Sequence, residues 1–200
     1  MIFPEIDTPA VLVDLDVAEE NIDRFQAHCD AHGLKLRPHI KTHKLPRLAQ
    51  RQVLAGAIGI TCQKISEAEA MISEGGIDDV LITFNIIGKD KLPRLRELAK
   101  KVRLSVVADN VATVDGLAEA FADAVTPLTV LVECDTGGAR CGVATPEAAA
   151  LLARYIADQK GVEFGGLMTY PPVGQEAAVQ DWLAQAKELA EASGLAVPVI

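Results

Sequence analysis

One short stretch of the chain concentrates side chains that can do chemistry: Arg37-Pro38-His39-Ile40-Lys41-Thr42-His43-Lys44. A neutral amine attacks a carbonyl carbon to form a Schiff base, and a lysine among other cations ionises less readily, because each positive neighbour disfavours its charged form. Lys41 is therefore the candidate nucleophile. A solvated basic loop or a patch that binds anions is the alternative, since runs of charge usually lie on the surface.

The surroundings of this stretch indicate where it lies in the fold. A short apolar strand is expected at residues 34–36, directly before it, and a helical pattern follows it. In α/β folds the functional side chains gather at the carboxyl ends of the strands. We therefore expect Lys41 at such an end.

Composition and charge narrow the classes of function. Half of the 200 residues are hydrophobic and 24% are charged, which is typical of a soluble globular domain. The net charge of -9 argues against broad affinity for nucleic acid or for an anionic membrane, so an anionic small molecule suits the local basic stretch better. No run approaches the roughly 18 apolar residues of a membrane span, and the first residues lack a basic leader. We expect a cytoplasmic protein.

Cysteines and histidines offer little evidence for a metal. Cys29, Cys62, Cys134 and Cys141 are widely spaced, and without export signals we expect neither disulfides nor a zinc site from them. A histidine pair at 28 and 32 has the spacing of metal ligands on a helix, but it lies at a helix end, where solvated histidines are commoner.

The pattern of apolar residues predicts alternating strands and helices. Capping signals mark several helix starts, including a capping box of Ser66 with Glu69 and an N-cap at Thr145. Strands are expected at 8–15, 34–36, 58–62, 80–84, 102–108, 128–132 and 164–168, and helices at 17–32, 45–54, 66–74, 89–100, 111–124, 146–158 and 176–192.

This alternation predicts the fold class. Strands without a period of two, separated by amphipathic helices, indicate a parallel sheet covered on both faces. Strand starts recur near 34, 57, 79, 102 and 128, which is the rhythm of a (β/α) barrel of the TIM type in a single domain, 1–200. An open doubly wound sheet is the alternative, but no strand leads into a Gly-x-Gly-x-x-Gly turn.

Residues just after each strand are the candidates for a site in such a barrel. Some have simpler explanations: Asn110 can cap the following helix, Gly137-Gly138 can serve a tight turn, and Arg140 can bind either an anionic ligand or the carboxylate of Asp135. The candidates are Lys41, Gln63, Asn85, Asp109, Asn110, 135–140, Thr169 and Tyr170.

Three motifs give the chain a family resemblance. They are the lysine stretch at 37–44, Gly59-Ile60-Thr61-Cys62-Gln63-Lys64-Ile65-Ser66-Glu67-Ala68, and Val132-Glu133-Cys134-Asp135-Thr136-Gly137-Gly138-Ala139-Arg140-Cys141-Gly142-Val143. Together they resemble the D-threonine aldolase and D-serine dehydratase-like family, which belongs to the pyridoxal-phosphate enzymes with an alanine racemase-type barrel (fold type III). Cys62-Gln63-Lys64 and Arg140-Cys141-Gly142 look more like the aldolases.

The resemblance implies roles for individual residues. Lys41 matches the lysine that carries pyridoxal phosphate, and Arg140 looks like the arginine that contacts the phenolic oxygen of the cofactor. Gln63 and Tyr170 match positions that line the cofactor. The sequence departs from the aldolases at 168–172, where they tend to have Tyr-His-Gly, so the resemblance does not define the substrate pocket.

The resemblance also implies that the chain is the amino-terminal portion of a longer enzyme. The family's barrel begins with the lysine strand, so residues 11–15 would lie outside the barrel and its seventh strand would be cut at Ile200. The phosphate loop, the eighth strand and a β-rich second domain with His and Asp ligands for a divalent metal such as Mn would be missing. The full-length enzyme is expected to be a homodimer.

The implied activity is cleavage of a D-3-hydroxy amino acid substrate, most similar to that of D-threonine aldolase, which yields glycine and an aldehyde. Dehydration of D-serine or D-3-hydroxyaspartate is the alternative reaction. A pyridoxal-phosphate-binding barrel without catalysis is the alternative of another class.

Overall fold

The computed structural model describes residues 3–200 and holds a sheet of five parallel strands in the order β1-β2-β3-β4-β5. The strands are β1 (Ile60–Cys62), β2 (Asp79–Ile82), β3 (Arg103–Ala108), β4 (Leu128–Cys134) and β5 (Val162–Thr169). The helices are α1 (Leu15–Ala31), η1 (Ile40–Thr42, a 3-10 turn), α2 (Pro46–Ala55), α3 (Ile65–Ile72), α4 (Lys91–Ala99), α5 (Val111–Phe121), α6 (Pro146–Ala157) and α7 (Glu176–Ala192).

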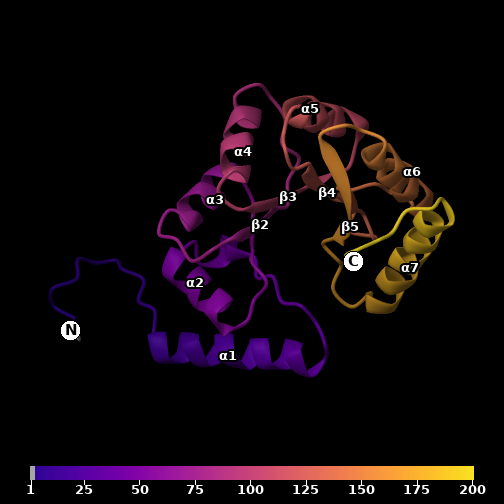
Figure 1. Cartoon of the computed structure of the whole chain (residues 1–200). Coiled ribbons are helices and arrows are strands. Elements are labelled where there is room, and N and C mark those ends of the chain that lie inside the picture. Colours follow the sequence, from indigo (N-terminus) through magenta and orange to yellow (C-terminus); the bar gives the residue numbers. More distant parts are fainter. Residues whose placement is uncertain (1–2) are drawn as a thin grey trace.

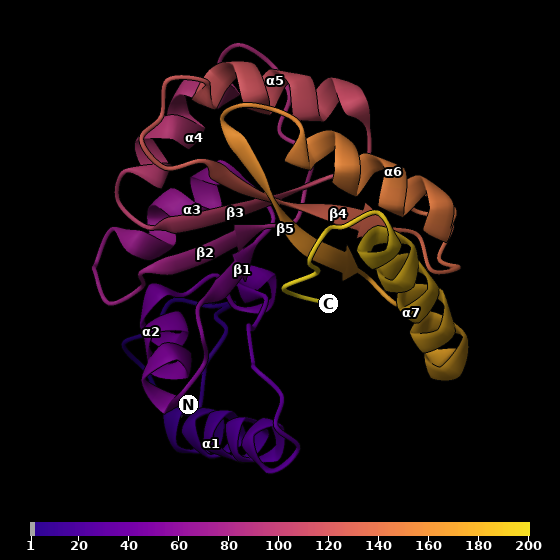
Figure 2. The same cartoon turned by 45° about the vertical axis from the view of Figure 1, so that its right-hand side comes forward.

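Helices α3 to α6 form an arc outside the curved sheet, with α1 and α2 at the β1 end and α7 at the β5 end (Figures 1 and 2). Each of the strands β1 to β4 is followed by a helix that returns the chain to the start of the next parallel strand, and α7 follows β5. This is the architecture of a (β/α) barrel, and the predicted fold class is confirmed.

The segment before Lys41 pairs with β1 although it is not a regular strand. The carbonyl of Leu36 accepts the Ile58 N–H at 2.9 Å, and the carbonyl of Pro38 accepts the Thr61 N–H at 2.8 Å. His39 then forms an isolated parallel bridge with Thr61. Because proline has no N–H to donate, the ladder stays incomplete. The strand predicted at 34–36 is therefore wrong in place: the pairing lies slightly later, at 36–39.

The strand predicted at 8–15 is wrong. Helix α1 begins at Leu15, and the Asp14 side chain caps it by accepting the Val17 N–H at 3.2 Å. Val11, within the preceding apolar run, is 95% exposed. A strand needs a partner for its backbone groups, and none of the described strands pairs with this run.

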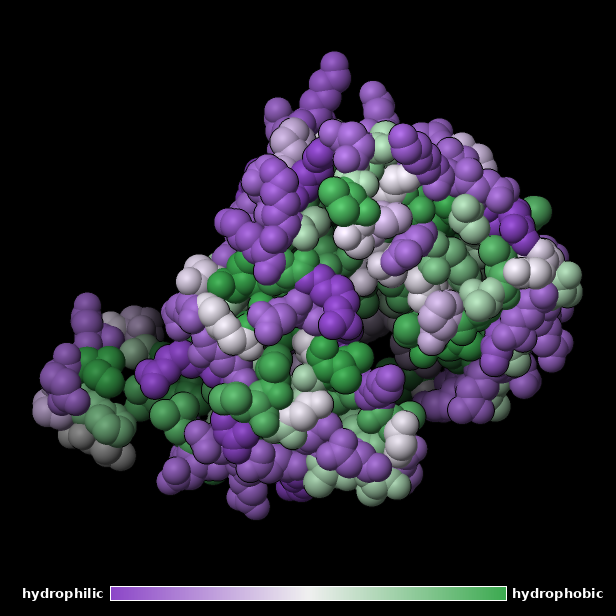
Figure 3. Space-filling model, viewed as in Figure 1, coloured by the Kyte–Doolittle hydropathy of each residue, from purple (hydrophilic) through white to green (hydrophobic). Residues whose placement is uncertain are grey.

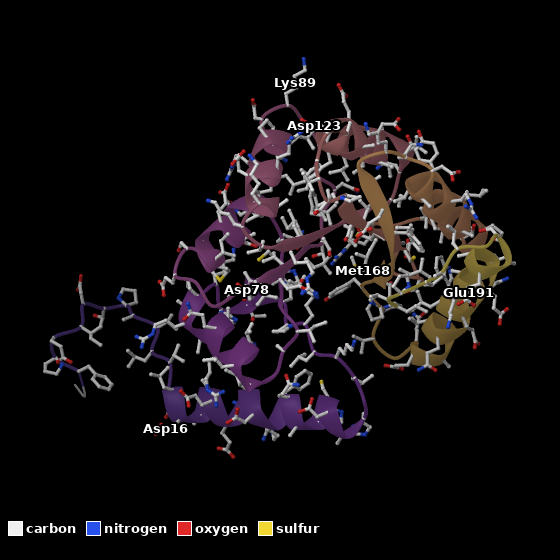
Figure 4. The ribbon with its side chains drawn as sticks, viewed as in Figure 1. Asp16, Asp78, Lys89, Asp123, Met168 and Glu191 are labelled. Atoms are coloured by element: carbon white, nitrogen blue, oxygen red, sulfur yellow. The ribbon has the colours of Figure 1, made fainter. Side chains whose placement is uncertain are left out.

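Both faces of the sheet are buried, which explains the absence of a period of two in the sequence. The larger apolar layer, between sheet and helices, includes Val80, Ile82, Val106, Val130 and Leu167. A smaller one lies on the inner, concave side, where Met168 points to the middle of the molecule while labelled charged residues such as Lys89 and Glu191 lie at its edge (Figure 4). This inner set is Leu81, Val107, Leu131 and Met168.

The surface agrees with this layering. Hydrophilic residues cover the rim over the outer helices, and apolar residues gather toward the centre of the view in Figure 3. No helix among residues 3–200 is long and apolar enough to cross a membrane.

Of the two helix starts predicted from capping motifs, one is confirmed and the other is wrong. Thr145 caps α6, its hydroxyl accepting the Ala148 N–H at 3.2 Å, as expected. The capping box of Ser66 and Glu69 is wrong, because α3 already begins at Ile65 and Glu69 instead pairs with Arg94 on α4. A short motif specifies a helix start only when the chain enters the helix at that residue.

Candidate active site

Three of the four predicted cofactor residues meet at the carboxyl ends of the strands. The Lys41 Nζ lies 5.2 Å from the centre of the Tyr170 ring, and the Arg140 Cζ lies 4.3 Å from the same centre. Tyr170, the residue after β5, is 60% exposed. Among residues 3–200, no carboxylate lies within ion-pair distance of Lys41 or Arg140. Two cations without a carboxylate partner in the described chain therefore lie against one aromatic ring, and the ring attracts each of the two charges.

Three other basic side chains of the lysine segment have partners of their own. Arg37 pairs with Asp79 at 2.7 Å, Lys44 pairs with Glu67 at 3.0 Å, and His43 hydrogen-bonds a glutamine of α2. These three side chains therefore do not form one dense basic cluster around Lys41, as the sequence had suggested, because each binds a different partner. Arg140, a hundred residues along the chain, is the cation that shares the Tyr170 ring with Lys41.

His39 holds the start of the turn that carries Lys41. Its Nδ1 accepts the Lys41 backbone N–H at 3.3 Å, so the ring proton belongs on Nε2. Burial, followed by the positive charge of Lys41, lowers the pKa of His39, and the ring is neutral at pH 7. The nearby Gln63 side chain opposes this lowering of the His39 pKa but does not outweigh it. The His39 Nε2 is buried and has no hydrogen-bond partner in the described chain. Gln63, the fourth predicted residue, therefore lies on the lysine side of the site.

The loop after β4 presents Arg140 through a tight turn around Asp135. The Asp135 Oδ1 accepts the backbone N–H groups of Gly137 and Ala139, each at 3.0 Å. Asp135 thus holds the turn instead of binding Arg140, so the salt bridge considered from the sequence is not formed. The turn that Gly137 was expected to permit is present, and the φ of Gly137 is +116°.

Asp109, after β3, joins three neighbouring strand ends. Its Oδ1 accepts hydrogen bonds from the side-chain amides of Asn85 at 2.8 Å and Asn110 at 2.7 Å, while its Oδ2 accepts the Gly142 N–H at 3.2 Å. Asn110 also caps α5, as the simpler explanation predicted, by accepting the Thr113 N–H at 2.9 Å. These residues fix the loop of Arg140 from the side of β3.

Glu133 and Cys141 form a contact that sequence reasoning missed. Glu133 is 4% exposed near the end of β4, and the Cys141 thiol donates to its Oε1 at 3.0 Å. Burial, together with the negative charge of Asp109, raises the pKa of Glu133. A lone acid inside the apolar strand 128–134 was the available signal, since a buried acid needs a partner.

Cys62, Cys134 and Cys141 do not provide a thiolate nucleophile. Burial raises the pKa of Cys62 and of Cys134 to about 12, and burial with the nearby Glu133 also raises that of Cys141. Thiols with such pKa values stay protonated at neutral pH. All four cysteines are free, as predicted.

Metal ligands do not cluster in the described chain, where no group of three or more His, Cys, Asp or Glu side chains could hold an ion. His28 and His32 lie with ring centres 4.3 Å apart on the exposed end of α1. Thr169, another predicted site residue, is bound to β4 through the Cys134 carbonyl at 2.9 Å.

Comparison with known proteins places this arrangement in a family. The sequence matches the family described as "Alanine racemase, N-terminal domain" over residues 13–199. The chain belongs to the alanine racemase N-terminal domain family. The resemblance expected from the three motifs is therefore confirmed at the level of the family.

Relatives of this alanine racemase N-terminal domain include enzymes of two kinds. D-Threonine aldolase of Arthrobacter sp is 41% identical over 165 residues, covering 82% of this chain and 43% of that protein. D-threo-3-Hydroxyaspartate dehydratase of Delftia sp. is 34% identical over 209 residues, covering 98% of this chain and 54% of that protein. The structure of D-threonine aldolase from Filomicrobium marinum matches with a TM-score of 0.92 at 36% identity, covering 98% of this chain and 55% of that chain. The chain spans about half the length of these relatives.

Proposed function

We propose that the protein carrying this chain is a pyridoxal-phosphate-dependent lyase that acts on D-3-hydroxy amino acids. The observation that carries the proposal is the convergence of the Lys41 amine and the Arg140 guanidinium on Tyr170 at the strand ends. Aldolases and dehydratases among the relatives support the same class of reaction.

The residues present fit pyridoxal phosphate. A Schiff base needs a primary amine that is not committed to a carboxylate, and Lys41 meets this condition within residues 3–200. A phenolate oxygen needs a fixed cation, and Arg140 supplies one with fork geometry. The Tyr170 ring offers an apolar face, and the unused Nε2–H of His39 is a buried donor next to the lysine turn.

When bound, pyridoxal phosphate withdraws electrons from the Cα of an amino acid, so that a bond at Cα can break. The chain's own residues would then act by position. Lys41 would supply the primary amine for the Schiff base, Arg140 would neutralise negative charge on the ligand, and the Tyr170 ring, which both cations approach, would line the site. The hydrogen bonds that Asp109 and Asp135 accept would hold the Arg140 loop in place beside the ligand.

Cleavage of the Cα–Cβ bond, as in an aldolase, is the reaction we favour, because the aldolase of Arthrobacter sp is 41% identical to this chain. Dehydration is the second candidate, supported by the dehydratase of Delftia sp. at 34% identity. A divalent metal that orients the 3-hydroxyl group would take its ligands from outside the described residues, and we propose a homodimer for the full-length enzyme.

We expect the full-length protein to cleave D-threonine to glycine and acetaldehyde. The assay offers D-threonine and D-serine, each with and without manganese, and measures aldehyde and keto acid separately. Keto acid without aldehyde would move the assignment to a dehydratase. Tight binding of pyridoxal phosphate with neither product would favour the non-catalytic binding protein instead.

Replacing Arg140 with alanine should shift the absorbance of the bound cofactor and its dependence on pH, because the fixed positive charge beside the phenolate is lost. Thermal unfolding should change little, since Arg140 is exposed and has no carboxylate partner in the described chain. Arg47→Ala, at an exposed arginine on α2, is the control and should alter neither property. A large loss of stability with an unchanged spectrum would assign Arg140 a structural role.

A further inference from the structure

Lys44, three residues after Lys41, binds a carboxylate that links two loops of the site. Its Nζ lies 3.0 Å from the Oε1 of Glu67 on α3, which is 8% exposed. The other oxygen, Oε2, accepts the backbone N–H of Gln63 at 3.0 Å. One buried carboxylate thus joins the loop that carries Lys41 to the loop after β1.

The backbone at Lys44 is strained. Its φ is +52°, and its N–H donates to the Ile40 carbonyl at 2.8 Å, closing the turn that contains Lys41. A non-glycine residue in this region costs about 1–2 kcal/mol, and such strain persists where surrounding contacts hold it. Among residues 3–200 the other non-glycine residue with positive φ is Ala139, directly before Arg140. The strained positions therefore border the two cations of the site.

The charge state of Glu67 fits this linking role. Burial acts to raise the pKa of Glu67, but the hydrogen bonds from Lys44 and from the Gln63 backbone, with the charge of Lys44, outweigh it and lower the pKa. Removing Lys44 would leave a buried anion with only one strong partner, and a buried charge without compensation rearranges its surroundings.

We propose that Lys44 is a positioning residue, which acts through Glu67 to hold the Lys41 turn against the loop of Gln63. The lysine segment then contains two lysines with separate tasks: Lys41 meets the ligand, and Lys44 sets where Lys41 stands. The effect on cofactor binding rests on the proposed function, whereas the effect on the loop does not.

The test uses Lys44→Met in the full-length protein, which keeps an unbranched side chain of nearly the same length and removes its charge. The dissociation constant of pyridoxal phosphate, measured by absorbance titration, should rise between about tenfold and a hundredfold, as expected for misplacement of a reacting group. Amide hydrogen exchange over residues 37–45, measured on the protein without cofactor, should become faster. Lys44→Arg retains the charge and should restore most of both properties.

A second ion pair on the same helix provides the matched control. Glu69 of α3 pairs with Arg94 of α4 at 2.5 Å, and both side chains are about half exposed, at 42% and 50%. Arg94→Met removes one cation from one carboxylate of α3, but it should leave both measurements unchanged because neither residue touches the site loops.

Two outcomes would overturn the proposal. One is unchanged exchange over residues 37–45 in Lys44→Met, and the other is a lower unfolding temperature with unchanged affinity for pyridoxal phosphate. If the unsubstituted protein itself binds no pyridoxal phosphate, the proposed function fails, while the exchange measurement still decides whether Lys44 holds the turn.

Discussion

Alanine in place of Lys41 in the full-length protein is expected to abolish covalent attachment of pyridoxal phosphate and to lower kcat by at least about a thousandfold, because Lys41 supplies the amine that lies beside Tyr170 together with Arg140 within residues 3–200. Lys44 is paired with Glu67, so it cannot take the place of Lys41 without leaving a buried carboxylate without its cation. Borohydride reduction followed by peptide mapping should find the pyridoxyl group on Lys41 in the unsubstituted protein and on no residue in the variant.

Lys35→Ala is the control for this experiment, because Lys35 is exposed and lies just before the same segment. It should keep both the reducible adduct and the activity. An adduct on Lys44 or Lys35 in the unsubstituted protein would show that Lys41 is not the attachment site.

Gly142→Ala should have the second largest effect, on stability and on the cofactor spectrum together. The φ of Gly142 is +104°, and an added Cβ would lie 2.5 Å from the Asp135 backbone nitrogen and 2.6 Å from the Cys134 carbonyl carbon. Backbone atoms cannot swing aside as a side chain can, so the loop that carries Arg140 must move. We expect the free energy of unfolding to fall by about 3 kcal/mol and the cofactor absorbance to shift as in Arg140→Ala.

Gly88→Ala is the control that separates the cost of backbone strain from the cost of a steric clash. Its φ is +105°, nearly the same as that of Gly142, but an added Cβ would meet nothing within 4 Å. Gly88→Ala should therefore lose only about 1–2 kcal/mol, the cost of the backbone conformation alone. Urea unfolding of both variants measures the difference, and equal losses would mean that the contact at Gly142 is relieved without cost.

The helices and strands were predictable where both ends carry local signals. The predicted helix at 176–192 has the observed bounds of α7, and Thr145 caps α6 as its position suggested. The strand predicted at 8–15 failed because apolar, β-branched residues do not form a strand without a neighbour to receive their hydrogen bonds. The local sequence pattern limits which secondary structure a segment can form, and the availability of a neighbouring strand decides whether a strand forms.

For the candidate site, the sequence predicted which residues lie near one another but not which side chains contact each other. Counting residues after each strand brought Lys41, Arg140 and Tyr170 together before their distances were known. The partner of each charged side chain could not be predicted by counting residues after the strands. The pairing of Lys44 with Glu67, and of Cys141 with Glu133, depends on how far each loop folds back, which sequence spacing does not record.

The place of Tyr170 gives the molecule a built-in optical probe. The sequence contains two tyrosines, and the other, Tyr155, donates its hydroxyl to Asp115 at 2.6 Å on the outer helices. The absorption of a phenol ring responds to charges near its face, and only Tyr170 has two cations there within the described chain. Ultraviolet difference spectra of this 200-residue chain, recorded during a titration, would thus report ligands that approach Tyr170 without any assay of activity.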